Sequence, residues 1–382
     1  MLPPPRRPSI AAAWLVPVLV ALAGCSAPAP AEKPPLTDAA LAAVKQGAGA
    51  PREQLARKID NLFADPAAMG ETRALLVMHG GRVVAERYAP GYGPDTRFVS
   101  WSMAKTITAV MIGMLVADGR LRLDESPPVP LWQRPGDPRG EITLRQLLQM
   151  RSGLRHTEGG DPPYESSEAV MLFLAGRDDM ARFAEEQPLE AEPGAKFEYS
   201  SATTVILSDI AARVLAHANG AEARRRAVDE FLEARIFAPL AMESMVPEYD
   251  AAGTQIGGSM IHGTARDWGR FGDFLRNKGS YRGSQLVPRQ WVEFMTTPSP
   301  RAGDYGGQTW LNRRSEARGD DQVLFPGRGP DSLFSLVGHM GQYVLVSPDQ
   351  QLTVVRLGHS DDAQRAALMP ALAEIVELYP AR

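Results

Sequence analysis

The chain has 382 residues but only one cysteine, Cys25. A single cysteine can form no internal disulfide and can build no cysteine-based metal cluster. The chain also lacks an excess of positive charge, because 41 Lys and Arg residues stand against 45 Asp and Glu residues, for a formal net charge of −4. Without that excess, little can hold a phosphate backbone by counterion release, and nucleic acid is not an expected partner.

Several motifs of other catalytic and nucleotide-binding families are missing as well. The sequence has no G-x-S-x-G nucleophile elbow, no H-E-x-x-H zinc motif and no G-x-x-x-x-G-K-[ST] phosphate loop. Its six histidines are scattered along the chain. We therefore expect no metal, no nucleotide and no other cofactor. Apolar material is plentiful at 44% of the residues, which is enough to build a large core.

The N-terminal segment has the layout of a secretory signal peptide. Two arginines precede an apolar run over residues 10–23, and small residues follow, so residues 1–24 are predicted to be removed on export. The apolar run is too short to span a bilayer. The last residues of this segment, LAGC up to Cys25, resemble the lipobox of bacterial lipoproteins.

The lipobox resemblance implies that Cys25 becomes the acylated N-terminus of the mature protein, and two or three acyl chains suffice for stable anchoring. Ser26 follows the cysteine, which by resemblance to Gram-negative lipoproteins favours the outer membrane, facing the periplasm. Residues 25–37 are rich in Pro and Ala and predict an extended tether. The alternative is a plain signal peptide beside a chance cysteine.

Residues 38–382 are predicted to form the folded unit, with strands near both of its ends. Two helices are expected within residues 38–63, and strand-like runs at 74–78 and 82–88 flank His79-Gly80-Gly81, where Gly-Gly suits a tight hairpin turn. A helix is expected over 102–118, with an apolar stripe and Gly119 as its cap.

After about residue 120 the unit is first mainly helical, and strands return only near its end. Helical patches predominate over about 121–249, two strands are expected at 343–346 and 352–357, and an amphipathic helix at 362–378. Early and late strands with helices between them indicate one sheet built from both ends of the chain. We therefore expect an α/β part, about 38–120 and 250–382, and a separate helical part.

Ser102 and Lys105 are the first residues with a catalytic mechanism. Residues three apart in a helix share a face, so the Lys105 amine can reach the Ser102 hydroxyl. A serine at a helix N-terminus feels the positive end of the dipole, and a partly desolvated lysine can titrate low enough to accept its proton. By itself, however, S-x-x-K is a weak signal.

The surrounding sequence strengthens that signal. Residues 98–106, FVSWSMAKT, resemble the active-site helix of class C beta-lactamases and related esterases. Further segments follow in the same order: residues 142–154 resemble "ITLRHLLTMTSGL", residues 193–201 resemble "PGxxFxYSN", and residues 257–267 resemble "GGLxSTARDLARF". The chain therefore resembles the serine beta-lactamase-like superfamily.

This resemblance implies an α+β fold of the beta-lactamase and DD-peptidase type: an antiparallel sheet flanked by helices, beside an all-helical subdomain, with the active site in the seam. It also maps the second catalytic motif onto Tyr199. A phenol near two cationic or amine groups can have its pKa lowered from about 10, so Tyr199 could serve Ser102 as general base. Either Lys105 or Tyr199 could be the primary base, and a core tyrosine is the structural alternative.

The third motif of the family corresponds to residues 337–342, VGHMGQ. His339 stands where beta-lactamases have a lysine, in the His-x-Gly pattern of esterase and amidase relatives, and Gly341 would let substrate lie close to the strand. By the same resemblance, the backbone amides of Ser102 and Gln342 would form the oxyanion hole.

Two positions near the predicted site are interpreted as structural. Ser259 has no lysine at i+3, so we expect it to be scaffold near the cleft rather than a second nucleophile. Trp101, beside the predicted nucleophile, is interpreted as a packing residue, with a substrate platform as the alternative.

Ser201 and His339 depart from the beta-lactamase pattern. Ser201 replaces the asparagine that holds the substrate amide, and a histidine carries little positive charge near neutral pH, so an anionic beta-lactam would be held less well. Both residues are predicted to bind substrate. The Tyr-x-Ser and His-x-Gly patterns together resemble the 6-aminohexanoate-dimer hydrolases and the esterases grouped with them.

We therefore expect a serine hydrolase that cleaves ester or amide bonds of small molecules or short peptides through an acyl-enzyme on Ser102. One alternative is a beta-lactamase or DD-peptidase that acts on beta-lactams or cell-wall peptides. Another is a catalytically silent homologue that binds a peptide or partner in the old cleft.

Overall fold

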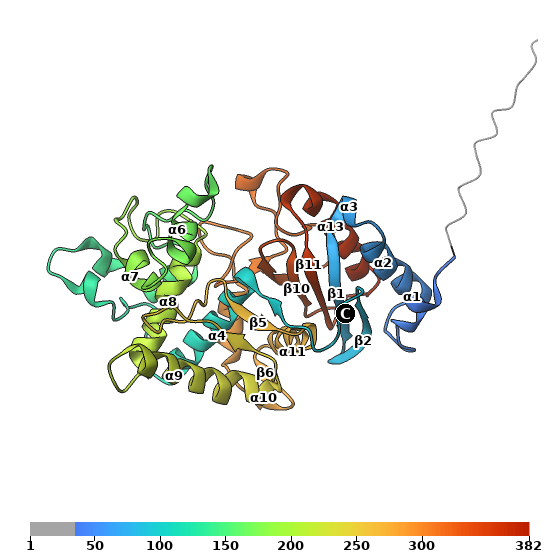
Figure 1. The fold of residues 1–382 in the computed structure, drawn as a ribbon, viewed down its shortest axis with the longest axis horizontal. Coiled ribbons are helices and arrows are strands. Elements are labelled where there is room, and N and C mark those ends of the chain that lie inside the picture. The colour runs from blue at the N-terminus through green and yellow to red at the C-terminus, as the bar shows by residue number, and fades with distance from the viewer. Residues whose placement is uncertain (1–34, 382) are drawn as a thin grey trace, which may run out of the picture. The chain divides into compact units, whose positions relative to one another are not determined.

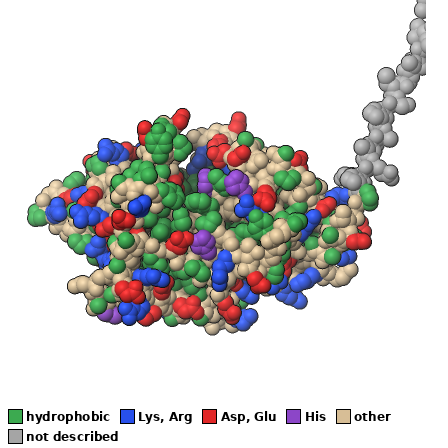
Figure 2. Space-filling view, in the orientation of Figure 1, with side chains coloured by type: hydrophobic (Ala, Val, Ile, Leu, Met, Phe, Trp, Pro, Cys, Tyr) green, Lys and Arg blue, Asp and Glu red, His purple; other side chains and the backbone are tan. Residues whose placement is uncertain are grey.

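The computed structural model describes residues 35–381 (Figure 1). The predicted signal peptide, Cys25 and most of the tether lie outside these described residues. Within residues 35–381, no helix has the length and apolar character needed to cross a membrane. Figure 2 shows acidic and basic side chains interspersed over the visible face of the molecule, without a broad surface of one sign.

The main sheet has six strands, all antiparallel, in the order β2-β1-β11-β10-β9-β8. Two strands come from the start of the folded unit and four from its end: β1 (Glu71–His79), β2 (Arg82–Tyr88), β8 (Trp310–Leu311), β9 (Phe334–Gly338), β10 (Gln342–Ser347) and β11 (Leu352–His359). Direct pairing of β1 with β11 confirms that both ends of the chain build one sheet. Gly80 and Gly81 turn between β1 and β2 with φ of +56° and +77°, as Gly-Gly predicts.

Alternating residues of the strands face two different cores. In β1, Leu76 packs in the core that contains Phe271 of α11 (Ala265–Arg276), whereas Leu75 packs in the core that contains Ile59 of α2 (Arg52–Ala64). This two-residue period is what a strand covered on both faces requires. The helices that accompany α2 are α1 (Asp38–Ala42), α3 (Pro66–Met69) and α13 (Asp362–Val376).

The helical part lies between the two groups of strands in the sequence and fills the left of Figure 1. Its centre is α8 (Ser201–Leu215), which is buried over nearly its whole length. Around it lie α5 (Leu144–Leu148), α6 (Ser167–Phe173), α7 (Met180–Glu185) and α9 (Ala221–Leu232). A π-helical turn at Glu233–Phe237 continues α9 into α10 (Ala238–Leu240).

Helix α4 (Ala104–Ala117) joins the two parts of the molecule. Residues 104–115 are all buried, and α4 packs against α8 within the core that also includes one face of the sheet. A small second sheet consists of β3 (Phe98–Val99), β5 (Ile261–Gly263) and β4 (Val246–Pro247), of which β3 comes just before α4 in the sequence. The remaining α-helix and strands of the described residues are α12 (Arg289–Met295) and the hairpin of β6 (Ser280–Tyr281) and β7 (Ser284–Gln285).

Candidate active site

Ser102 lies in a tight turn rather than in the first turn of the α-helix. Residues Trp101–Met103 form a 3-10 turn, and α4 begins only at Ala104. Trp101 has a φ of +46°, a conformation that is strained for a bulky side chain and that clusters at functional sites. The turn is held to β5, because Ile261 donates its backbone N–H to Ser100 Oγ at 3.1 Å.

Lys105 is buried, one helical turn beyond Ser102. Its Nζ donates to Ser102 Oγ at 2.9 Å, to Ser201 Oγ at 2.7 Å and to the backbone oxygen of Gly258 at 2.8 Å. An ammonium group has three N–H donors, so these contacts use all of them. A Cβ on Gly258 would lie 2.8 Å from the backbone oxygen of Ser201, which explains why a glycine carries this carbonyl.

Tyr199 completes the predicted constellation. Its phenol is close enough to Ser102 and Lys105 for both to act on its pKa, and Lys105 Nζ lies 4.8 Å from the centre of its ring. The ring packs against Tyr305 and Trp310, with centroids 5.7 Å and 5.1 Å away. The structure thus brings together three side chains that are separated by as many as 97 positions in the sequence.

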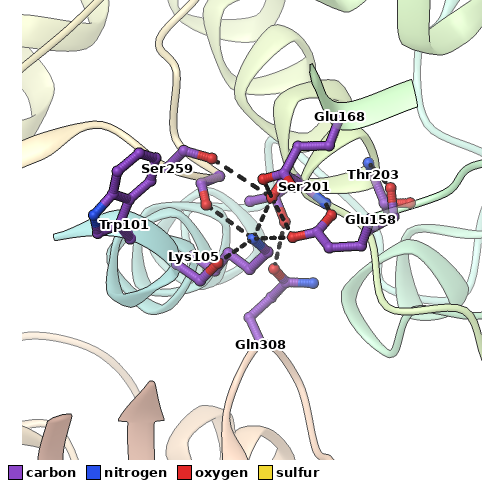
Figure 3. A network of polar contacts seen from close by, with 12 residues as sticks. Trp101, Lys105, Glu158, Glu168, Ser201, Thr203, Ser259 and Gln308 are labelled. Atoms are coloured by element: carbon purple, nitrogen blue, oxygen red, sulfur yellow. Dashed lines mark hydrogen bonds and ion pairs between the residues drawn. The ribbon is translucent and has the colours of Figure 1, made fainter. Parts of the chain in front are cut away.

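Two carboxylates that the sequence analysis did not predict lie near Lys105. Ser201 Oγ lies 2.7 Å from Glu158 Oε1 and 2.9 Å from Glu168 Oε1, and Lys105 Nζ lies 3.7 Å from Glu158 Oε1 (Figure 3). Glu158 also accepts the backbone N–H of Ser201 at 2.5 Å. Neither acid belongs to a motif, and the segment that contains them shows no family pattern, so the sequence offered no signal for them.

The pKa shifts of Lys105 and Tyr199 are both opposite to the predicted direction. Burial alone lowers the pKa of Lys105, but Tyr199, Glu158 and Glu168 outweigh it and raise that pKa above its usual value. Burial raises the pKa of Tyr199, and the field and hydrogen bond of Lys105 offset this only in part. The expectation of a low-pKa lysine and a low-pKa tyrosine is therefore wrong, because it left out the two carboxylates near Lys105 and the burial of Tyr199.

A cavity of about 690 Å³ opens onto Ser102. Its lining includes Ser102, Tyr199, Glu158, Glu168, Phe173 and residues 338–341. Trp101 also lines it, while its ring packs edge-on against His339 at 5.4 Å between centroids, so it both packs and faces the cavity. In the chain from residue 35 to 381, no three His, Cys, Asp or Glu side chains gather in a way that could hold a metal ion.

Comparison with known proteins supports the assignment of this fold. The model of the beta-lactamase family matches residues 59–377. The chain belongs to the beta-lactamase family. It is similar to the 6-aminohexanoate-dimer hydrolase of Paenarthrobacter ureafaciens, with 24% identity over 317 residues that cover 76% of this chain and 73% of the relative.

Solved structures of other proteins share the fold. A D-stereospecific amidohydrolase from Streptomyces sp. has a TM-score of 0.58 and 19% identity, over 86% of this chain and 98% of that chain. A family VIII carboxylesterase has a TM-score of 0.63 and 16% identity, over 87% and 98%. The predicted superfamily and α+β fold are confirmed, and the relatives support a hydrolase.

The structure places the family's substrate-binding positions unevenly. His339 and Gly341 lie in the cavity-lining turn between β9 and β10. Ser201, by contrast, has no exposed surface and does not line the cavity. Its contacts are with Lys105 and the carboxylates, so its position favours a role in holding Lys105 over the predicted contact with substrate. Ser259 is buried nearby, with its hydroxyl 3.5 Å from Ser201 Oγ.

The turn after β9 is fixed from behind. The side chain of Gln342 donates to the backbone oxygens of Met340 at 3.0 Å and Gly358 at 2.6 Å, and Arg356 donates to the backbone oxygen of Gly341 at 2.8 Å. Gln342 itself is buried and does not line the cavity, whereas residues 338–341 do. Its amide as oxyanion donor stays a prediction, while its side chain has a structural role that the sequence analysis did not anticipate.

Proposed function

We propose that the chain is a serine hydrolase that cleaves ester or amide bonds of small molecules or short peptides. The observation that carries this proposal is the contact between Ser102 Oγ and Lys105 Nζ at 2.9 Å, with Lys105 Nζ 4.8 Å from the centre of the Tyr199 ring. Ser102 and Tyr199 line a cavity of about 690 Å³. Nucleophile and base within hydrogen-bonding reach, with the base oriented by further groups, is the arrangement that covalent catalysis requires.

In the proposed reaction, Ser102 Oγ attacks the substrate carbonyl carbon and its proton passes to the Lys105–Tyr199 pair. The pair returns a proton to the leaving alcohol or amine as the C–O or C–N bond breaks, which leaves an acyl-enzyme. Water then attacks the acyl-enzyme with the same pair as base. The backbone amide of Ser102, with Gln342 as the predicted second donor, stabilises the oxyanion.

The raised pKa values of Lys105 and Tyr199 determine the pH dependence of this reaction. The pair accepts a proton only after it has lost one, and both shifts move that loss to higher pH. We therefore expect kcat/KM to increase with pH from neutral into the alkaline range.

Fluorophosphonate labelling tests the proposal. Intact-mass analysis is expected to show one adduct on the wild-type protein and none on Ser102→Ala, together with turnover of p-nitrophenyl esters by the wild type only. A wild-type protein that is folded but neither labels nor turns over any ester or amide would support the catalytically silent homologue instead.

Hydrolysis of beta-lactams or cell-wall peptides is a second candidate, favoured by two arginines. Arg318 and Arg365 line the cavity, and a guanidinium group is suited to binding a carboxylate. Arg318 already pairs with Asp304 at 2.6 Å, which reduces the charge it offers to a substrate. Turnover of nitrocefin that exceeds turnover of p-nitrophenyl esters would favour this second candidate.

We also propose that Cys25 is lipidated and anchors the enzyme in the bacterial outer membrane, facing the periplasm. The support is the sequence pattern of residues 1–25 alone. Incorporation of labelled palmitate into the wild type, and its loss in Cys25→Ser, would test this. Equal labelling of both would contradict it.

A further inference from the structure

Glu158 and Glu168 reach the site from two different elements. Glu158 lies in the loop before α6, and Glu168 lies in the first turn of that helix. Both meet at the hydroxyl of Ser201, the first residue of α8 (Figure 3). An unbroken series of hydrogen bonds therefore runs from Ser102 through Lys105 and Ser201 to the two carboxyl groups.

The number of protons in this network is limited. Ser201 has one hydroxyl proton, but its Oγ lies within 2.9 Å of one oxygen from each carboxyl group. One hydroxyl proton cannot be donated to two carboxylates at once, whereas the oxygen can accept from Lys105 and from a protonated acid. The geometry is therefore satisfied when Glu158 and Glu168 share one proton and carry one net negative charge toward Lys105.

The other charged and titratable groups of the site are few. Glu158 and Lys105 act on the pKa of Glu168, and Tyr199 acts on that of Lys105. Glu168 is mostly buried beside Glu158, and burial first, then repulsion by Glu158, raises its pKa to about 7. The two acids thus supply the negative charge that balances the buried ammonium of Lys105.

We propose that Glu158 and Glu168 are positioning residues for Lys105: acting through the Ser201 hydroxyl, they hold the Lys105 ammonium in line with Ser102 and keep it charged at neutral pH. This inference rests on the proposed function. It also assigns Ser201 to the support of Lys105 rather than to substrate contact, and it explains why a fully buried lysine stays charged despite its desolvation.

Charge-removing variants test the inference through the pH profile. Above about pH 7 the second carboxyl group of the wild-type pair ionises, and in Glu158→Gln and Glu168→Gln it cannot. One negative charge near Lys105 is therefore lost at alkaline pH, and the pH at which kcat/KM for p-nitrophenyl butyrate rises is expected to fall by about one unit. The plateau value of kcat is expected to fall about tenfold, because Lys105 is less well held, while KM for this neutral ester stays within about twofold. Glu168→Asp should restore part of the shift.

Glu165→Gln is the matched control. Glu165 is exposed on the short turn before α6 and does not line the cavity. Its variant is expected to keep the wild-type profile. A Glu168→Gln profile that coincides with that of Glu165→Gln would overturn the inference. A rise in KM with no change in the pH at which kcat/KM rises would also overturn the inference, because that result would make Glu168 a substrate contact.

A second measurement needs no turnover. With glutamate labelled by 13C at the carboxyl carbon, NMR titration is expected to show one resonance with a midpoint near 7 that disappears in Glu168→Gln and persists in Glu165→Gln. Because Lys105 lowers the pKa of Glu168, this midpoint is expected to rise in Lys105→Met and, to a smaller degree, in Ser201→Ala.

The two measurements separate the possible failures. If the titration is linked to Lys105 but Ser102 neither labels nor turns over substrate, the network stands and the proposed function fails. If Ser102 is reactive but the midpoint near 7 is absent, or is unmoved in both Lys105→Met and Ser201→Ala, the inference is overturned and the proposed function stands.

Discussion

Two pairs of acids lie in or beside the helical part of this molecule, one buried and one partly exposed at the cavity, and they differ in what surrounds them. Glu185, at the end of α7, pairs with Asp209 of α8, and burial first, then Asp209, raises the pKa of Glu185 to about 9. Glu158 and Glu168 form a pair of similar chemistry at the wall of the cavity. In each pair the pKa of one acid is raised, so that acid holds its proton to a higher pH than an exposed acid would.

The neighbours of each pair decide its role. Asp209 accepts hydrogen bonds from Arg213 and Arg224, and neither Asp209 nor Glu185 lines the cavity. The pair of Glu185 and Asp209, with these arginines, therefore links α7, α8 and α9. The pair at the cavity has Lys105 as its cation and Ser201 as its link, so its charge reaches the predicted nucleophile. A raised carboxyl pKa therefore shows only that the acid is desolvated or close to another acid. Its hydrogen-bond partners indicate whether it supports the site or the fold.

Loss of the cation at the cavity is expected to have the largest effect. Lys105→Ala removes the group that donates to Ser102, and the rate of fluorophosphonate labelling should fall by about a thousandfold, in the range of general-base removal. The thermal midpoint is expected to fall as well, because Glu158 and Glu168 lose their cation, so labelling is measured on the folded protein. Labelling at the wild-type rate would contradict the catalytic assignment of Lys105.

Removal of the acid in the other pair is expected to act on stability instead. Asp209→Ala leaves Arg213 and Arg224 without their shared carboxylate, and the free energy of unfolding in urea should fall by about 3 kcal/mol. The folded fraction should keep kcat/KM within about twofold of the wild type. A large loss of kcat/KM at unchanged stability would remove the distinction between the two pairs.

The proton on Glu185 gives the next largest effect. Its pKa is raised to about 9 in the folded state, so unfolding releases a proton between about pH 4.5 and 9, and stability falls as pH rises through that window. Glu185→Gln cannot ionise and should gain about 2 kcal/mol over the wild type between pH 5 and 8. Parallel pH profiles of unfolding free energy for the two proteins would contradict the shift.

The smallest predicted effect concerns the link between Lys105 and its acids. Ser201→Ala should lower kcat about tenfold, as expected for the loss of a hydrogen bond to a charged group. Ser208→Ala is its control, because Ser208 is buried on the same helix and its hydroxyl has no hydrogen-bond partner among the described residues. Equal effects of the two variants on kcat would indicate that Ser201 has only a packing role.

The sequence predicted the framework because its signals are local. The hairpin at Gly80-Gly81, the S-x-x-K turn and the segment around Tyr199 each depend on a few neighbouring residues, and each is found where it was expected. The start of the helix was less well predicted, since the 3-10 turn at Trp101–Met103 depends on contacts with β5.

What the sequence could not predict depends on contacts between distant segments. Glu158 and Glu168 lie more than fifty positions from Lys105, on a loop and a helix with no motif, so their approach follows only from the packing of α6 against α8. The pKa directions of Lys105 and Tyr199 depend on these acids and on burial. The structural role of Gln342 was not predictable either, because its side chain donates a hydrogen bond to the backbone of Gly358 in the next strand.

The pairing of β1 with β11 has a consequence for how this protein is made. Residues 71–79 leave the ribosome long before residues 352–359, so β1 has one open edge for most of synthesis. Such contacts between distant segments also slow folding, because a long loop must close before they form. A nascent chain that carries the reactive serine and lysine therefore lacks the last strands of its scaffold until residues 352–359 have been made, and products that end before them are expected to be inactive and prone to aggregate.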